Sequence, residues 1–141
     1  MNDDSITQYI LATFPGVETT TNFGYTFLFY GSDRTLPLAS LAASDNEYDR
    51  VSNLDRAGVF RLNIGITRDT FRSLFGAKEL DISSYDFSAL DTLMPHPHYA
   101  QQHYICILNP SKTNSEKLKA LLAEAYDLAL TRGTKRRKST G

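Results

Sequence analysis

The segment VFRLNIGI, residues 59–66, constrains the fold more than any other stretch of the chain. Its side chains alternate between the two faces of an extended strand. One face is entirely apolar, with Phe60, Leu62, Ile64 and Ile66, and the other carries Val59, Arg61, Asn63 and Gly65. An apolar strand face has to be covered by another layer of structure. The segment therefore predicts a sheet with helices packed against it.

Two of the covering helices are predicted from the residues at their ends. Ser5-Ile6-Thr7-Gln8 has the pattern of a capping box, and Pro15-Gly16 ends the helix that follows it. Thr67 is placed to cap a second helix, RDTFRSLF, and Gly76 ends that helix. Residues 85–94 are expected to add one or two further helical turns.

The last helix is the clearest element of the sequence. It follows a second capping box, Thr113-Asn114-Ser115-Glu116, and is expected to end at Gly133. Between these ends the apolar residues recur at intervals of three and four and form one stripe: Leu118, Leu121, Leu122, Ala125 and Ala129. Residues 133–141 are expected to form a basic, disordered tail.

Further strands are predicted by alternation or by short apolar runs. NFGYTFLFYG, residues 22–31, leads through a turn at Gly31–Arg34 into LPLASLAA, residues 36–43, which completes a hairpin. HYICIL, residues 103–108, is expected in the interior of the sheet, with Cys106 as a packed thiol. The predicted fold class is α+β: a two-layer, twisted antiparallel sheet flanked by helices, in the order α-β-β-β-α-β(-β)-α.

The length of 141 residues fits a single domain, which we place at residues 1–132. No apolar run is long enough for a transmembrane helix, and the acidic N-terminus MNDDSITQYI does not have the pattern of a secretory signal. We therefore expect a cytoplasmic protein without a membrane partner. The formal net charge of −1 does not support a dedicated nucleic-acid binder. One cysteine excludes an internal disulfide.

Four phrases, in their order along the chain, resemble the MmcQ/YjbR-like proteins. They are ATFPGVETTTNFGYTFLFY, VFRLNIGITRDTFRSLFG, HPHYAQQHYICILNP and LLAEAYDLALTR. The resemblance covers the chain up to about residue 132. It looks like a distinct bacterial subfamily of unknown function, with a longer charged loop. The resemblance implies an α-β-β-β-α-β-β-α fold and a DNA-binding role, and it implies no catalytic residue.

All three histidines lie within residues 93–110, LMPHPHYAQQHYICILNP. His96 and His98 have the spacing of two metal ligands on one side of a strand. The flanking prolines favour polyproline II, in which residues at this spacing point about 120° apart. His103 approaches them only if the intervening residues fold back. We interpret the segment as a proline-stiffened corner before a strand, with a metal site as the alternative.

The charged loop at residues 44–56 is the second candidate region. Asp45, Glu47 and Asp49 have the spacing of a calcium loop, but Arg50 and Arg56 stand where that loop needs glycine and glutamate. Either arginine is a candidate for holding an anionic ligand. The alternative is that the arginines pair with neighbouring aspartates and support the turn.

Phe23, Tyr25, Phe27 and Phe29 form an aromatic ladder on one predicted strand face. Such a ladder is a stacking platform in some single-strand RNA binders. The favoured interpretation is that these rings belong to the core beneath the helices.

We predict a small binding module whose site forms where loop 44–56 meets residues 95–104. The candidate ligand-binding residues are Asp45, Asp49, Arg50, Arg56, His96, His98, Tyr99 and His103. The expected partner is an anionic or polar small ligand or a protein, and no cofactor, catalytic residue or metal ligand is assigned. The alternatives are a DNA-binding protein, as the resemblance implies, and a metal-dependent enzyme that uses the histidines. We expect a monomer or a homodimer.

Overall fold

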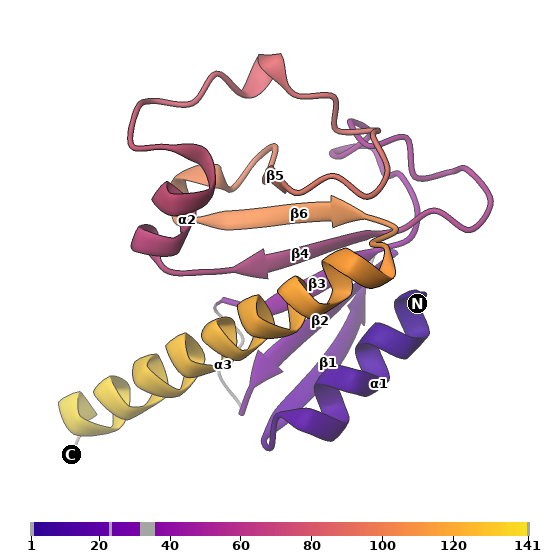
Figure 1. Cartoon of the computed structure of the whole chain (residues 1–141). Coiled ribbons are helices and arrows are strands. Elements are labelled where there is room, and N and C mark those ends of the chain that lie inside the picture. The colour runs from indigo at the N-terminus through magenta and orange to yellow at the C-terminus, as the bar shows by residue number, and fades with distance from the viewer. Residues whose placement is uncertain (1, 23, 32–35, 141) are drawn as a thin grey trace.

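A six-stranded antiparallel sheet forms the centre of the computed structural model, which describes residues 2–22, 24–31 and 36–140, with side chains up to residue 132 (Figure 1). The strands are β1 (Val17–Asn22), β2 (Tyr25–Tyr30), β3 (Ala39–Ala42), β4 (Arg61–Gly65), β5 (Met94–Pro95) and β6 (Tyr104–Leu108). Their order across the sheet is β1-β2-β3-β4-β6-β5. The predicted α+β class is confirmed.

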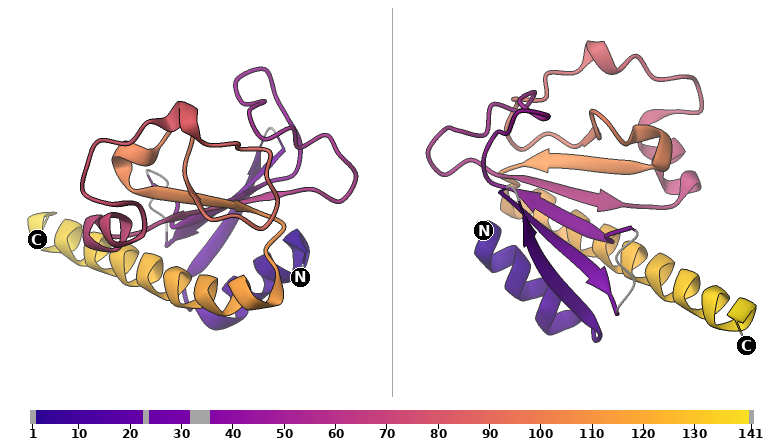
Figure 2. Two further views of the ribbon diagram at one scale, coloured as in Figure 1. Left: turned by 45° about the horizontal axis from the view of Figure 1, so that its top comes forward. Right: turned by 180° about the vertical axis from the view of Figure 1, so that it is seen from behind.

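Helices cover one face of this sheet and long loops cover the other. The helices are α1 (Asp3–Thr13), α2 (Arg68–Phe75) and α3 (Lys112–Thr140), with short 3₁₀ turns η1 (Ile82–Ser84) and η2 (Ala100–Gln102). Figures 1 and 2 show α1 and α3 on one side of the strands. The segments that join β3 to β4 and α2 to β5 lie on the opposite side. Among the described residues, no helix has the length and apolar composition needed to cross a membrane.

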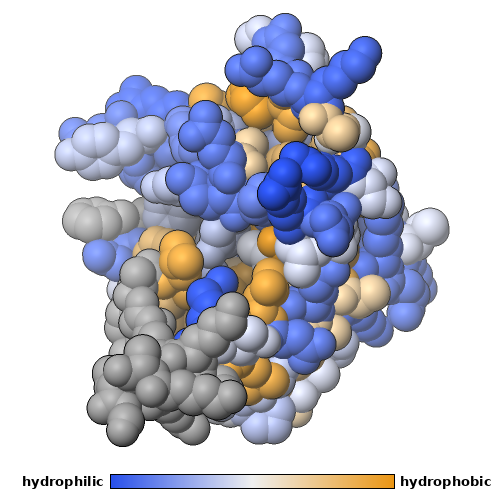
Figure 3. All heavy atoms as spheres, turned by 90° about the vertical axis from the view of Figure 1, so that its left-hand side faces the viewer, coloured by the Kyte–Doolittle hydropathy of each residue, from blue (hydrophilic) through white to orange (hydrophobic). Residues whose placement is uncertain are grey.

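The main core lies between the sheet and the helices. It contains the apolar face predicted for residues 59–66 together with Leu28, Leu41, Ile105 and Ile107 of the neighbouring strands. The predicted stripe of α3 is buried against these side chains. Both predictions are confirmed. Alternation in a strand and a 3.6-residue period in a helix show directly which face of the element is apolar. In Figure 3, hydrophobic side chains also reach the surface in the middle of one end of the molecule, among hydrophilic ones.

The loop-covered face of the sheet carries the polar residues of the strands. The register aligns Phe27, Ser40, Asn63 and Cys106 across β2, β3, β4 and β6. The next row contains Tyr25, Ala42, Arg61 and Leu108. A smaller apolar cluster fills part of this face: Ala42, Leu54, Phe87, Met94, Cys106 and Leu108. Cys106 is buried as predicted, and burial raises the pKa of its thiol to about 12.

The strand prediction was wrong at the start of the sheet. Residues 17–22, VETTTN, form the edge strand β1, so four strands precede α2 where three were predicted. Only Val17 of this strand is buried, and an exposed polar strand has no apolar alternation to reveal it. Gly24 lies in the turn of the β1–β2 hairpin, with φ of 80°, and not in a strand. Phe23 and the predicted turn residues 32–34 lie outside the described residues.

The helix boundaries differ from the predicted ones. Asn2 caps α1 and pairs with Ser5 in a capping box, so the helix begins before the predicted cap at Ser5. Helix α3 begins at Lys112, and the hydroxyl of Ser111 accepts from the main chain of Asn114. The prediction that Gly133 ends α3 was wrong, since the helix continues to Thr140. One glycine costs a helix only about 1 kcal/mol relative to alanine. Thr67 caps α2 and Gly76 ends it, as predicted.

The segment 85–94 was also predicted wrongly. It forms no α-helix; η1 precedes it, and Met94 and Pro95 form the short strand β5 at the edge of the sheet, paired with β6. Proline is compatible with this position because an edge strand leaves one side of its main chain unpaired. The segment crosses the loop-covered face, and His96 and His98 after it line the same cavity as Arg61.

Candidate functional site

A cavity of about 800 Å³ lies between the loop-covered face of the sheet and the connections that join β2 to β3, β3 to β4 and β5 to β6. Its apolar and aromatic lining comes from Tyr25, Phe27, Leu36, Pro37, Tyr48, Tyr99 and Tyr104. Its polar lining comes from Ser40, Asn46, Glu47, Asp49, Arg61, Asn63, His96, His98 and Gln102. Residues far apart in the chain thus surround one space, with strands as its floor and loops as its walls.

A buried ion pair holds the floor of the cavity to loop 44–56. Arg61 is 0% exposed, and its two terminal nitrogens donate to the two carboxylate oxygens of Asp49 at 3.2 and 2.5 Å. The same guanidinium donates to Ser52 Oγ at 2.9 Å and to Asn63 Oδ1 at 3.0 Å. A bidentate pair of this kind fixes the orientation of both groups. Four of the five N–H groups of the guanidinium are therefore engaged within the protein.

The pair keeps Asp49 ionised in a buried position. Burial alone would raise the pKa of this carboxyl, but hydrogen bonds from Arg61 and from Tyr25 bring it down to about 2. The Tyr25 hydroxyl donates to Oδ2 of Asp49 at 2.7 Å. Burial and that hydrogen bond together raise the pKa of Tyr25. At neutral pH the floor carries one carboxylate and one guanidinium, whose charges cancel.

A tight turn presents Asp49 to the sheet. Asn46 and Asp49 pair through their main chains, at 3.2 and 3.3 Å, which reverses the chain between them. The side chain of Asn46 accepts from the main-chain N–H of Tyr48 at 2.8 Å. As a result Asp49 points inward, while Tyr48 is 85% exposed at the rim of the cavity.

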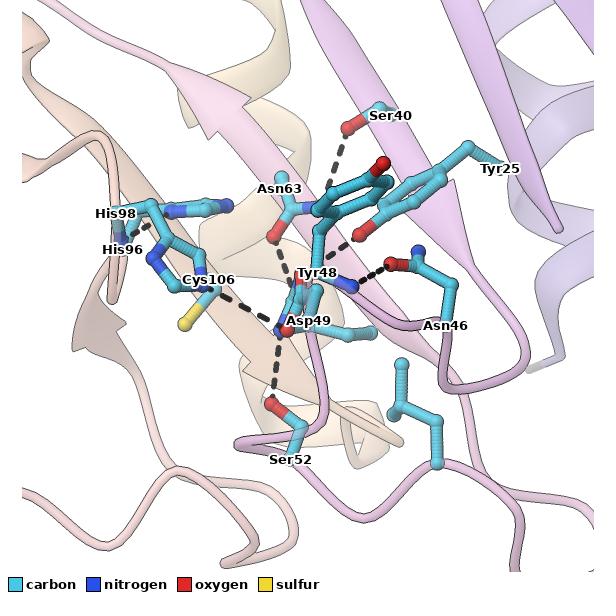
Figure 4. A network of polar contacts seen from close by, with 12 residues as sticks. Tyr25, Ser40, Asn46, Tyr48, Asp49, Ser52, Asn63, His96, His98 and Cys106 are labelled. Atoms are coloured by element: carbon cyan, nitrogen blue, oxygen red, sulfur yellow. Dashed lines mark hydrogen bonds and ion pairs between the residues drawn. The ribbon is translucent and has the colours of Figure 1, made fainter. Parts of the chain in front are cut away.

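The polar residues of β3 and β4 continue the network across the floor. Asn63 accepts from Arg61 through Oδ1, which leaves its Nδ2 to donate to Ser40 Oγ at 3.1 Å. The direction of each hydrogen bond is fixed, because the guanidinium of Arg61 is only a donor. Figure 4 shows these side chains in a row beside Asp49.

His96 is held in one orientation at the side of the cavity. Its Nδ1 accepts from the main-chain N–H groups of His98 and Tyr99, at 3.0 and 3.1 Å. Burial, together with the positive charge of Arg61, lowers the pKa of His96 to about 3. His96 is therefore neutral at physiological pH. In Figure 4 its ring points from the loop toward the space above Asn63.

His98 approaches the floor from the opposite direction to Tyr25. Its Nε2 lies 3.8 Å from Oδ1 of Asp49, too far for a hydrogen bond but close enough for an ion pair when the ring is protonated. The side chain is 42% exposed. His96 is thus a fixed, neutral group, while His98 meets solvent at the edge of the cavity.

Four of the eight predicted site residues meet at the cavity: Asp49, His96, His98 and Tyr99. The other four do not line it. Asp45 accepts from the main chain of Leu54, and Arg50 donates to the main-chain oxygen of Asn46. Both are therefore engaged in holding loop 44–56 together.

Arg56 and His103 also lie outside the lining of the cavity. Arg56 donates to the carbonyl oxygens of Asn53, Ser52 and Ser88, and so ties the loop to the segment before β5. His103 packs against Phe71 of the helix side, with ring centroids 5.5 Å apart, and has φ of 66°. The contacts of Arg56 agree with the alternative in which an arginine supports the turn. Its hydrogen bonds go to carbonyl oxygens, however, and not to aspartates.

The described rings of the aromatic ladder, Tyr25, Phe27 and Phe29, lie on the face of β2 opposite the core residue Leu28, so the prediction that they form core beneath the helices was wrong. Tyr25 and Phe27 stack with ring centroids 5.5 Å apart and an interplanar angle of 18°. Both line the cavity. The alternation correctly placed the two rings on one face, but it cannot tell which of two faces the helices cover.

The sequence analysis missed Arg61, Asn63 and Ser40, which form the floor. A signal for them was present, since Arg61 and Asn63 share one face of an otherwise apolar strand. A buried arginine is rare unless it is paired, so its partner had to come from elsewhere in the chain. Nothing in the sequence identified Asp49 as that partner over Asp45 or Asp55.

Gly65 makes room for one wall of the cavity. Tyr104 lies across it, and a Cβ at position 65 would be 2.9 Å from Cζ of the ring. The Tyr104 hydroxyl donates to the carbonyl oxygen of Pro37 at 2.6 Å. We expect Gly65→Ala to displace the ring, break this hydrogen bond and lower the free energy of unfolding by about 1–3 kcal/mol in urea titrations.

As a control, the same substitution is made in a Tyr104→Leu variant, which lacks the obstructing ring. There the same Gly65→Ala change is expected to have little effect or to stabilise slightly, because alanine is less costly than glycine in a strand. An equal loss in both backgrounds would contradict the proposed packing.

The described residues contain no group of three or more His, Cys, Asp or Glu side chains placed to hold a metal ion. His103 lies apart from the other two histidines, and Nδ1 of His96 is occupied by main-chain donors. The arrangement instead offers a rigid polar floor under aromatic walls.

Comparisons with known proteins assign the sequence to a family but identify no activity. Residues 1–138 match the family described as "Family of unknown function (DUF6194)". No curated protein and no solved structure matches the chain.

Proposed function

The chain belongs to the DUF6194 family, whose function is unknown, and we propose that it is a binding protein for a small, largely apolar organic molecule that enters the cavity above β2, β3 and β4. The observation that carries the proposal is the combination of volume and lining. A space of about 800 Å³ has aromatic walls and a few polar groups with fixed orientation. Cavities that bind drug-sized molecules have volumes of about 300–1,000 Å³ and this kind of lining.

The rigidity of the floor supports a binding role. Arg61, Asp49 and Asn63 hold one another through buried hydrogen bonds, so a ligand meets polar groups that are already in place. Pre-organised groups lose little conformational entropy on binding. The rim is different, because Tyr48 and Tyr99 are exposed to solvent there.

The charge of the lining favours an uncharged ligand over an anion. Among the described lining residues, Glu47 and Asp49 oppose one guanidinium, that of Arg61, while Arg50 and Arg56 bond to main-chain oxygens outside the cavity. A phosphate-bearing partner such as DNA gains its affinity from unpaired lysine and arginine. The DNA-binding role implied by the resemblance to MmcQ/YjbR-like proteins stays a prediction that this site does not favour.

The proposal is tested with N-phenyl-1-naphthylamine, an uncharged aromatic dye whose emission rises in apolar surroundings. We expect saturable fluorescence enhancement with the wild-type protein. The substitution Ser40→Leu puts an apolar side chain into the cavity from β3 and is expected to reduce affinity at least tenfold, or about 1.4 kcal/mol. Titration of the dye with each protein measures this difference.

The matched control is Ser73→Leu, which makes the same change on the exposed surface of α2. It should leave dye binding unchanged, and circular dichroism establishes that both variants are folded. If the dye does not bind the wild type, or binds both variants equally, the cavity is not the site and the proposed function fails. Should Ser40→Leu not fold, NMR shifts of cavity residues on addition of the dye to the wild type decide the question.

A further inference from the structure

His96 presents one hydrogen-bond donor to the cavity. Main-chain N–H groups are donors only, so Nδ1 of His96 must accept from His98 and Tyr99 and the ring proton must sit on Nε2. The side chain is only 4% exposed, and the cavity is the space that it faces. Within the described part of the chain, Nε2 has no hydrogen-bond acceptor. No fully buried side-chain nitrogen or oxygen of the described residues lacks a partner, so Nε2 is open to the cavity, where a ligand or water can accept from it.

A second donor follows from the network on the floor. Since Asn63 Nδ2 donates to Ser40 Oγ, the hydroxyl proton of Ser40 is directed elsewhere. No acceptor for this proton is present among the described side chains and main chain, and Ser40 lines the cavity. In contrast, the hydroxyls of Tyr25 and Tyr104 already donate to Asp49 and to Pro37. His96 and Ser40 therefore each present an uncommitted proton to the cavity, beside the second Nδ2 proton of Asn63.

Aromatic rings border the cavity beside these donors. The rings of Tyr25 and Phe27 on β2 stack on each other, with centroids 5.5 Å apart and an interplanar angle of 18°, and both line the cavity. An aromatic ligand extends such a stack or meets its rings edge to face. The charges of Asp49 and Arg61 cancel through their bidentate contact, so they offer no net attraction to an ionised group.

From these contacts we propose that the ligand is a planar, uncharged aromatic molecule that carries a carbonyl oxygen, which accepts a hydrogen bond from Nε2 of His96. The Ser40 hydroxyl is available to the same oxygen or to a second acceptor. The inference rests on the proposed function, because it names the class of molecule that the same cavity takes. His96 is a binding group in this scheme, and no chemical step is assigned to it.

The experiment compares 9-fluorenone with fluorene, two flat tricyclic molecules that differ only in the carbonyl group. Isothermal titration calorimetry with the wild-type protein is expected to give about tenfold tighter binding for the ketone, the effect of one buried hydrogen bond. In His96→Leu this preference should disappear while fluorene still binds. His98→Leu is the matched control and should retain the preference, because the side chain of His98 does not hold the tautomer of His96.

Each contrary result has a definite meaning. Equal affinity for the two tricycles in the wild type, or binding of N-phenyl-1-naphthylamine but of neither tricycle, overturns the carbonyl assignment and leaves the proposed function standing. Failure of the dye and of both tricycles to bind overturns both. Tighter binding of fluorenone-4-carboxylate or of cationic 9-aminoacridine than of fluorenone shows that a charged ligand is preferred, and it also overturns the assignment.

A second measurement applies if His96→Leu does not fold. Nitrogen-15 NMR of the wild-type protein distinguishes the two imidazole tautomers. We expect the His96 proton on Nε2, and we expect the Nε2–H resonance to move on addition of fluorenone and not of fluorene. A proton on Nδ1, or equal shifts with both molecules, would overturn the inference.

Discussion

Asp49→Asn is expected to lower the free energy of unfolding by about 3–5 kcal/mol, measured by urea denaturation at pH 7. The change is nearly isosteric, but it leaves the guanidinium of Arg61 buried without a counter-charge. Removing one member of a buried ion pair is costly because the other charge has already lost its hydration. The same variant should also weaken binding of the dye, since loop 44–56 loses its strongest contact with the floor.

Two comparisons identify the buried charge as the cause. Glu116→Gln removes the exposed ion pair with Lys119 and is expected to cost less than about 1 kcal/mol. The double variant Asp49→Leu with Arg61→Met removes both charges and should recover part of the stability lost in Asp49→Asn. If the double variant is no more stable than Asp49→Asn, an unpaired charge does not explain the loss.

Acidification from pH 7.5 to pH 5 is expected to reduce the free energy of unfolding by about 2 kcal/mol through His96 alone. The pKa of His96 is lowered from 6.5 to about 3 by burial and by the charge of Arg61. Between these two values the unfolded chain binds a proton that the folded chain does not. Stability from this group is therefore fully present above pH 6.5 and is lost progressively as the pH falls toward 3.

Urea titrations at half-unit steps of pH, followed by circular dichroism, measure this slope. In His96→Gln the slope between pH 6.5 and pH 5 should largely vanish, whatever the stability of the variant at pH 7.5. His98→Gln is the matched control, because it leaves the His96 ring buried and should keep the slope. A wild-type slope that persists in His96→Gln would show that another group is responsible.

Asp49 makes the free energy of unfolding sensitive to acid at a lower pH than His96 does. Its pKa is about 2 when folded, below the ordinary 3.8, so the stability that it supplies is present above pH 4 and is lost as the pH falls through 2. The two windows are separate enough for the fall above pH 5 to report mainly on His96. They also connect stability to the site, since both groups border the same cavity.

Half of the predicted site residues line the cavity, because loop 44–56 and the histidine segment both stand out in the sequence as rich in polar residues. The prediction that these two regions meet at one recess agrees with the structure, which brings Asp49 beside His98. The choice of individual residues was less successful. Arg50 and Arg56 are as charged as Arg61, yet they bond to carbonyl groups of their own loop or its neighbour.

The sequence by itself determined the elements whose signal is local: the one-sided strand at residues 59–66, the stripe of α3, and hence the α+β class. Periodicity shows which residues share a face, because the geometry of a helix or a strand repeats along the chain. Only the tertiary structure decided which sheet face the helices cover and which aspartate reaches Arg61. Both depend on how the connections fold back over the sheet. The charge of Arg61 can be buried only because the loop between the paired strands β3 and β4 brings Asp49 to it.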